Sequence, residues 1–219
     1  MSTNQPVFVT GGTGYIGPPL IGALLARGYG VHALVRPGSE GKLPAAAVRV
    51  IGDALDESTF AGRVPTGATV VHLVGTPHPN PSKAAEFQRV DLTSIRATVA
   101  AALRARVRHL VYVSVAQAVP IMRAYVAARQ QGEAAVTASG IPATILRPLY
   151  VLGPGRSWPL VLLPMYAIFR RLPGTRDTAE RLSLVTRAQM VAALVRAVEQ
   201  PPAAGVRFVE VPEIRRTSA

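Results

Sequence analysis

A glycine-rich turn close to the first residue constrains the fold of this chain most. The segment TGGTGYIG, residues 10–17, follows a short apolar run, 7–10, and leads into a helical stretch, 16–27. Glycines allow a tight turn and a close approach of backbone to a pyrophosphate, whose charge then faces the free amides of a helix N-terminus. This context predicts a dinucleotide-binding turn. The contacts are expected from Gly11, Thr13, Gly14, Tyr15 and Ile16.

Apolar runs and helical stretches alternate along most of the chain. Such alternation predicts an α/β, Rossmann-type, doubly wound parallel sheet within a single domain, 1–219. Residues 148–186 are rich in proline, glycine and large apolar side chains, and we expect them to form a small substrate-side lobe inserted at the sheet's C-terminal edge. The expected strands are 7–10, 31–35, 48–51, 69–74, 110–113, 143–146 and 206–211, and the expected helices are 16–27, 56–61, 83–106, 121–139 and 187–200.

The end of the second expected strand bears on the choice of nicotinamide cofactor. About 20 residues after the glycines, an acidic side chain typically accepts a hydrogen bond from the ribose 2′-hydroxyl of NAD. Here that place holds Arg36, 19 positions after Gly17. A guanidinium pairs with a 2′-phosphate and offers nothing to a bare hydroxyl that needs an acceptor. The sequence therefore favours NADP over NAD. The alternative interpretation of Arg36 is a solvated arginine that contacts no ligand.

Composition excludes several classes of protein. With no cysteine, thiolate catalysis, cysteine zinc sites and iron–sulfur clusters are excluded, and the histidines show no metal-ligand spacing. The net charge is +12, but its arginines are scattered without interleaved aromatic residues, so nucleic-acid binding is not expected. The longest apolar stretch, 158–169, is too short to span a membrane, and we expect a cytoplasmic protein. Residues 158–171 form either a helix packed on the domain or a surface helix that contacts lipid or a partner; a homodimer stays open.

Several segments in order resemble the atypical and extended short-chain dehydrogenases/reductases, which include epimerase-like and NmrA-like NAD(P)-binding proteins. The similar segments are TGGTGYIG (10–17), GD (52–53), VHLVG (71–75), VYVS (111–114) and ILRP (145–148) followed by GPG (153–155). The resemblance implies contacts to the adenosine half of the cofactor from Asp53, Ala54, Val74 and Gly75. It also implies that Arg147 and Pro148 run along the nicotinamide side.

The same resemblance implies a catalytic helix in which Tyr125 exchanges a proton with the substrate oxygen. The family pattern is Tyr-x-x-x-Lys, whereas this chain has Arg129 in the lysine position. An arginine supplies a positive charge that lowers a tyrosine pKa, but it cannot relay a proton. The family's carbonyl-polarising hydroxyl falls at Val115 or Ala116, so Ser114 takes that role only if the strand end is shifted.

Two functions are consistent with these residues. The first is an NADP-dependent reductase of a small, apolar carbonyl substrate, with Tyr125, Arg129 and Ser114 as its catalytic groups. The second is a non-catalytic NADP(H)-binding sensor, scaffold or assembly factor, which the arginine at 129 and the missing hydroxyl favour. Binding of the dinucleotide is common to both.

Overall fold

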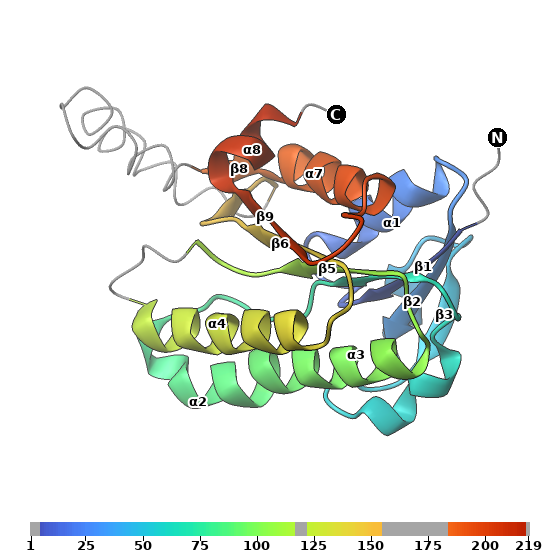
Figure 1. The fold of residues 1–219 in the computed structure, drawn as a ribbon, viewed down its shortest axis with the longest axis horizontal. Helices are drawn as coiled ribbons and strands as arrows, with labels where there is room; N and C mark the ends of the chain where they lie inside the picture. Colours follow the sequence, from blue (N-terminus) through green and yellow to red (C-terminus); the bar gives the residue numbers. More distant parts are fainter. Residues whose placement is uncertain (1–4, 117–121, 155–183, 218–219) are drawn as a thin grey trace.

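The computed structural model describes residues 5–116, 122–154 and 184–217, and its centre is a parallel sheet with helices on both faces (Figure 1). The strand order is β3-β2-β1-β4-β5-β6-β9, with all neighbours parallel. Chain order reverses between β1 and β4, as in a Rossmann sheet. The predicted fold class is therefore confirmed. The strands are β1 Pro6–Thr10, β2 Gly30–Val35, β3 Val48–Ile51, β4 Thr69–His72, β5 His109–Val113, β6 Ala143–Arg147 and β9 Val206–Glu210.

Helices cover the two faces of the sheet in separate layers (Figure 1). One layer holds α1 Gly17–Leu25, α7 Arg187–Glu199 and α8 Val211–Arg216, and the other holds α2 Ala84–Glu86, α3 Thr93–Arg104 and α4 Arg123–Ala138.

Each layer encloses its own apolar core. Val7 and Val9 belong to the core under α1 and α7, while Phe8 between them belongs to the core under α3. Successive side chains of a strand point to opposite faces, so a strand buried on both sides is apolar throughout. Burial of each large side chain contributes roughly 1.5–3 kcal/mol, which makes the sheet a firm platform for the loops at its edge.

Two expected helices differ in the structure, and one helix was not expected. The helix expected at 56–61 is two 3-10 turns, η2 Glu57–Thr59 and η3 Ala61–Arg63, because Phe60 between them has a non-helical backbone conformation. The helix expected at 83–106 is instead a series of short segments followed by α3. After β9 the chain forms α8, which the sequence did not predict. The segments before α3 are η4 Pro81–Lys83, α2 and the π-helical η5 Phe87–Leu92.

The base of the expected lobe is a two-stranded parallel pair. Strand β7, Val151–Leu152, pairs with β8, Val185–Thr186, and together they bracket residues 153–184. Residues 155–183, including the apolar stretch 158–169, lie outside the described residues, so the lobe stays a prediction. Within the described ranges, no helix combines the length and apolarity that crossing a bilayer would take.

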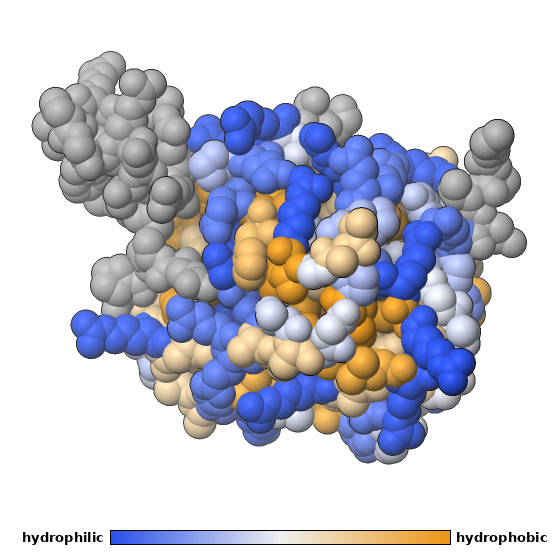
Figure 2. Space-filling model, in the orientation of Figure 1, coloured by the Kyte–Doolittle hydropathy of each residue, from blue (hydrophilic) through white to orange (hydrophobic). Residues whose placement is uncertain are grey.

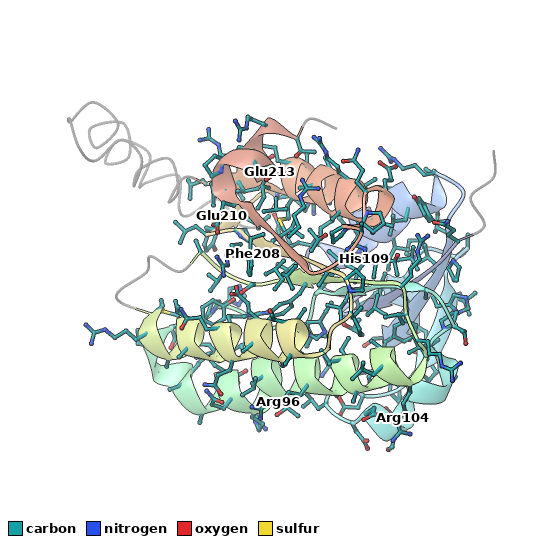
Figure 3. All side chains as sticks on the ribbon, viewed as in Figure 1. Arg96, Arg104, His109, Phe208, Glu210 and Glu213 are labelled. Atoms are coloured by element: carbon teal, nitrogen blue, oxygen red, sulfur yellow. The ribbon has the colours of Figure 1, made fainter. Side chains whose placement is uncertain are left out.

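Large apolar side chains are exposed at both edge strands of the sheet and on α3, at Val48, Phe208 and Leu103. Figure 2 shows hydrophilic residues spread over the helices of this face, with hydrophobic residues gathered between the two helical layers. Phe208 of the edge strand β9 is among the exposed large hydrophobic residues, and Figure 3 labels it beside Glu210. The homodimer considered from the sequence stays a prediction.

Candidate dinucleotide and active site

The sequence-predicted site residues lie at one edge of the sheet. Because all strands are parallel, the segments that follow their carboxyl ends meet at that edge, and the order reversal at β1 and β4 places a crevice there. The residues, each just after its strand, are Gly11 (β1), Arg36 (β2), Asp53 (β3), Val74 and Gly75 (β4), Ser114 (β5) and Pro148 (β6).

The glycine-rich turn has no room for side chains at two positions. Gly11 has a φ of +74°, and a Cβ on it would lie 2.8 Å from the backbone of Leu73, at the end of β4. A Cβ on Gly17 would lie 2.1 Å from the carbonyl oxygen of Gly12. Both glycines are therefore required for the turn to pack between β1, β4 and α1.

Backbone amides of this turn are available to a ligand. Among the described residues, no acceptor takes a hydrogen bond from the amides of Thr13 and Ile16, and Ile16 begins α1 without a side-chain cap. Pro18 and Pro19, in the first turn of α1, have no amide hydrogen. Free amides at the N-terminus of a helix form an anion site, so the turn fits the pyrophosphate of a dinucleotide. Gly14 is exposed at the same place, which leaves the backbone open to approach.

Arg36 stands at the end of β2 on a tight turn. The Ser39 amide donates to the Arg36 carbonyl at 3.1 Å, and Gly38 takes a φ of +79°. The side chain is exposed, and it forms no ion pair within the described residues. Its charge is therefore accessible to a phosphate. Both a 2′-phosphate ligand and a solvated arginine agree with this placement.

Asp53 and Ala54 follow β3, which is paired with β2. The Asp53 carboxylate is exposed and accepts the Leu55 amide at 3.0 Å, while the Asp53 amide donates to Thr59 Oγ1 at 2.9 Å. Ala54 is partly buried against the core. The local hydrogen bonds hold Asp53 at the same edge as Arg36, as the predicted adenosine contacts require.

Tyr125 and Arg129 lie on α4, one helical turn apart. The Arg129 guanidinium carbon is 5.3 Å from the centre of the Tyr125 ring, so both side chains share one face, as their spacing predicted. Arg129 Nη1 donates to Val113 O at 2.9 Å and to Val74 O at 3.4 Å. Tyr125 is therefore held near the carboxyl ends of β4 and β5.

Asp91 is the site residue that the sequence did not reveal. Its Oδ1 lies 2.7 Å from Arg129 Nη2, and the exposed fractions of the two side chains are 0% and 7%. Asp91 Oδ2 accepts from both the amide and the hydroxyl of Thr76, at 3.1 and 2.6 Å. Asp91 and Arg129 are 38 positions apart, and no local pattern indicates their pairing.

The environment keeps Arg129 positively charged. Burial opposes its charge, but attraction from Tyr125, Tyr112 and Asp91 outweighs burial and raises the pKa of the guanidinium. Burial raises the pKa of the Tyr112 hydroxyl, and the charge of Arg129 partly offsets this increase. The partly buried Tyr125 packs its ring 5.0 Å from that of Phe87.

Ser114 is buried at the end of β5. Its amide donates to Leu146 O at 2.8 Å, and its Oγ has no hydrogen-bond partner among the described residues. Val115 and Ala116, which occupy the places of the family's hydroxyl, are buried apolar residues. The catalytic role of Ser114 stays a prediction.

Arg147 is held by two carboxylates. It donates to Glu133 from Nε at 3.0 Å and from Nη2 at 2.5 Å, and to Glu210 from Nη1 at 3.0 Å. Its guanidinium also stacks on Phe208, 4.1 Å from the ring centre. The hydrogen bonds to Glu133 contribute most to raising its pKa. The predicted contact of Arg147 with the cofactor is untested, as is that of Pro148, whose carbonyl accepts from the Ala116 amide.

The side chain of Tyr15 connects the glycine-rich turn to the base of the expected lobe. Arg187, the first residue of α7, has its guanidinium 5.2 Å from the centre of the Tyr15 ring. A Cβ on Gly153 would lie 2.4 Å from the Tyr15 hydroxyl. The turn, β7 and α7 therefore converge at this residue.

Below this edge, a histidine is buried in β4. His72 Nδ1 lies 2.8 Å from Thr10 Oγ1 and 3.0 Å from Thr98 Oγ1, and Nε2 lies 3.3 Å from Ser94 Oγ. Burial lowers its pKa to about 3, assisted by the charge of Arg129. Hydroxyl partners and a neutral ring identify a packed core histidine. The described residues contain no cluster of three potential metal-binding side chains.

Comparison with known families agrees with this geometry. Residues 11–159 match the NAD(P)H-binding family, and this range includes the glycine-rich turn, Arg36 and α4. The chain belongs to the NAD(P)H-binding family. The match confirms the expected NAD(P)-binding protein and supports a nicotinamide dinucleotide as cofactor.

Named relatives of this NAD(P)H-binding chain are reductases. A ceramide reductase from Caulobacter vibrioides is 31% identical over 212 residues, which are 96% of this chain and 65% of the relative. A 4-hydroxy-2-methyl-3-oxo-4-farnesyl-3,4-dihydroquinoline-1-oxide ketoreductase from Stigmatella aurantiaca is 34% identical over 108 residues, 49% of this chain and 32% of the relative. The chain thus spans less than two thirds of the length of either one.

A solved structure shows the same fold. A short-chain dehydrogenase/reductase superfamily protein from Agrobacterium tumefaciens with bound NAD superposes with a TM-score of 0.68 at 20% identity. The match covers 94% of this chain and 77% of that protein.

Proposed function

We propose that this NAD(P)H-binding chain is an NADP(H)-dependent reductase that converts a carbonyl of an apolar substrate to an alcohol. The observation that carries the proposal is the position of Tyr125, held beside the charged Arg129 at the ends of β4 and β5. The named reductases among its relatives support the reaction class.

The preference for NADP(H) rests on Arg36. The amides of Thr13 and Ile16 accommodate the pyrophosphate of either nucleotide, whereas an exposed guanidinium at the end of β2 adds attraction only for a 2′-phosphate.

In the proposed reaction, Tyr125 gives its hydroxyl proton to the carbonyl oxygen. A bound NADPH would supply the hydride for the carbonyl carbon, and together with the proton from Tyr125 this would complete the alcohol. Arg129 packs over the Tyr125 ring and holds it at the ends of β4 and β5. The Ser114 hydroxyl, buried at the end of β5, is the proposed donor to the substrate oxygen.

The substrate class is proposed from the relatives and from the sequence of the lobe. Ceramide and a farnesylated quinoline oxide, named for the two reductases, are large apolar molecules that carry polar groups. Residues 158–169 of this chain are mainly apolar. We therefore propose a carbonyl on an apolar, lipid-like molecule rather than on a sugar.

The test is NADPH oxidation with a panel of carbonyl compounds of increasing hydrocarbon length. Tyr125→Phe should lower kcat by about 100-fold or more, because proton transfer by a positioned side chain typically contributes 10²–10⁴-fold. Tyr29→Phe is the matched control, since Tyr29 precedes the amino end of β2, at the opposite edge of the sheet. Equal turnover by the wild type and Tyr125→Phe would contradict the mechanism.

A non-catalytic NADP(H) sensor or scaffold is the second candidate. The residue types at positions 115 and 116, Val115 and Ala116, favour it. Both side chains are buried and apolar where the family carries its carbonyl-polarising hydroxyl. Loss of one such donor typically costs 10²–10³ in kcat. A sensor would bind NADPH normally and show no turnover with any carbonyl, whether or not Tyr125 is replaced.

A further inference from the structure

We propose that Asp91 and Arg129 form a buried positioning pair that fixes the ends of β4 and β5 around the bound cofactor. The pair also holds the ring of Tyr125. On this inference, which rests on the proposed function, Arg129 does not take the place of the family's catalytic lysine.

The first argument is connectivity. Arg129 on α4 donates to Val113 O at the end of β5 and to Val74 O beyond the end of β4. Asp91 on η5 accepts hydrogen bonds from both the amide and the hydroxyl of Thr76, which lies two residues after Val74. The 2.7 Å contact between Arg129 and Asp91 therefore joins two helical segments to two strand ends.

The second argument is space. A Cβ on Gly75 would lie 2.2 Å from Arg129 Nη2 and 3.3 Å from Asp91 Oδ1. The guanidinium thus fits directly against the backbone of the turn that follows β4. Because this turn is the predicted contact of the cofactor, a displacement of the pair would be transmitted to the cofactor site.

The third argument is the chemistry of the two charges. A buried lone charge is strongly unfavourable, so each member of the pair requires the other. The planar guanidinium contacts Asp91 through Nη2 and donates to the two carbonyls from Nη1. A lysine carries one shorter, compact ammonium and cannot reach both sides of this arrangement. Both terminal nitrogens therefore have partners inside the protein, while Nε has none among the described residues, and the side chain is 7% exposed.

Asp91 lies in an unusual helical segment. Residues Phe87–Leu92 form a π-helix directly before α3, and π-helical turns are frequent at functional sites. Asp91 is fully buried there, with Thr76 and Arg129 as its partners. Its position agrees with a role in shaping the site.

The experiment compares Asp91→Asn, Arg129→Met, their double variant and Arg129→Lys. Calorimetry gives the NADPH Kd, urea unfolding gives stability, and steady-state kinetics gives kcat and KM separately. Each single variant should lose stability, because one charge is left buried alone. The double variant should regain stability. It should nevertheless keep an NADPH Kd raised about 10-fold and a kcat/KM lowered about 10- to 100-fold, because the strand ends are no longer held in register with the cofactor.

The matched control is a surface pair with the same separation. Arg104 Nε lies 2.7 Å from Glu57 Oε1, and the Arg104 side chain is 75% exposed. Figure 3 shows Arg104 on the helical layer below the sheet. The double variant Glu57→Gln with Arg104→Met should leave the Kd, kcat and KM unchanged.

Two results would overturn the positioning role. The first is recovery of both stability and NADPH affinity in the double variant, which would make the pair structural only. The second is wild-type or higher kcat in Arg129→Lys, which would give Arg129 the lysine's role. If the wild type binds NADPH without any turnover, the reductase proposal fails while the NADPH Kd of the variants still decides the role of the pair.

Discussion

The two predicted halves of the cofactor site differ in how each holds its arginine. On the adenosine side, defined as residues 10–17, Arg36 and Asp53, Arg36 is exposed on a short turn. On the nicotinamide side, defined as Ser114, Tyr125 and Arg129, the arginine is buried against Asp91. The first side is built mainly from backbone close to one turn. The second depends on side chains brought together from three separate segments, which are the end of β5, α4 and η5.

This difference predicts which amino-acid substitutions each half of the site tolerates. An exposed side chain on a backbone-built site can be exchanged with little effect on folding, so its removal should alter affinity alone. A buried polar group supports folding and geometry together, because an unpaired polar or charged group is costly inside a protein. The predictions below test this division.

The largest effect is expected from a side chain in the glycine-rich turn. Gly17→Val should abolish measurable NADPH binding, a loss above about 100-fold, because its Cβ would lie 2.1 Å from Gly12 O. Gly22→Ala in α1 is the control, since nothing lies within 4 Å of a Cβ there. The control should bind normally and be equally or more stable, by up to about 1 kcal/mol. Calorimetry with circular dichroism checks both, and tight binding by folded Gly17→Val would refute the assigned turn.

The second prediction concerns pH and the buried side. Burial lowers the pKa of His72 from 6.5 to about 3, so below pH 6.5 the unfolded chain binds a proton that the folded chain does not. Stability should therefore be complete above pH 6.5 and decline as pH falls toward 3. By pH 4.5, His72 alone accounts for a loss of about 2–3 kcal/mol.

Urea unfolding at pH 7.5 and 4.5 measures this loss. His72→Gln should reduce the difference in stability between the two pH values, whereas His78→Gln, in an exposed loop, should leave it unchanged. His109, whose pKa burial lowers to about 4, adds a second contribution of the same sign. An unchanged pH difference in His72→Gln would show that this histidine is not held neutral.

The third prediction concerns affinity on the exposed side. Arg36→Ala should weaken NADPH binding about 10- to 100-fold, the range expected for hydrogen bonds between charged groups, and leave NADH binding unchanged. Arg96→Ala, which removes the same charge from the exposed face of α3, is the control. Calorimetry with both nucleotides separates the outcomes, and equal losses for NADPH and NADH would mean that Arg36 does not read the 2′-phosphate.

The smallest effect is expected where an ion pair is exposed. Glu210 binds Arg147 at 3.0 Å, but its side chain is 48% exposed and Arg147 keeps both hydrogen bonds to Glu133. Glu210→Gln should lower the free energy of unfolding by less than about 1 kcal/mol and leave NADPH affinity unchanged. Glu133→Gln, which leaves Arg147 partly buried with a weaker acceptor, should cost more. The reverse order in urea unfolding would contradict the burial-based ranking.

The adenosine side could be predicted from the sequence because its determinants are local. Gly11 and Gly17 are specified by a turn whose packing excludes side chains, and Arg36 lies a fixed distance along the same unit. The alternation of strands and helices predicted the sheet for the same reason, since each element shows its own periodicity. Short polar segments were less predictable: residues 56–61 form 3-10 turns, because Phe60, which is buried in the core, leaves helical geometry between them.

The tertiary structure alone decided the nicotinamide side. The sequence placed Tyr125 and Arg129 on one helix face, because a spacing of four is a property of the helix itself. It did not reveal that Asp91 pairs with Arg129 or that Glu133 and Glu210 hold Arg147. These contacts join residues from different elements, and their partners are chosen by which helix packs over which strand end. Local sequence thus determined the turn and the order of the elements, while the packing of distant segments determined where each buried charge is neutralised.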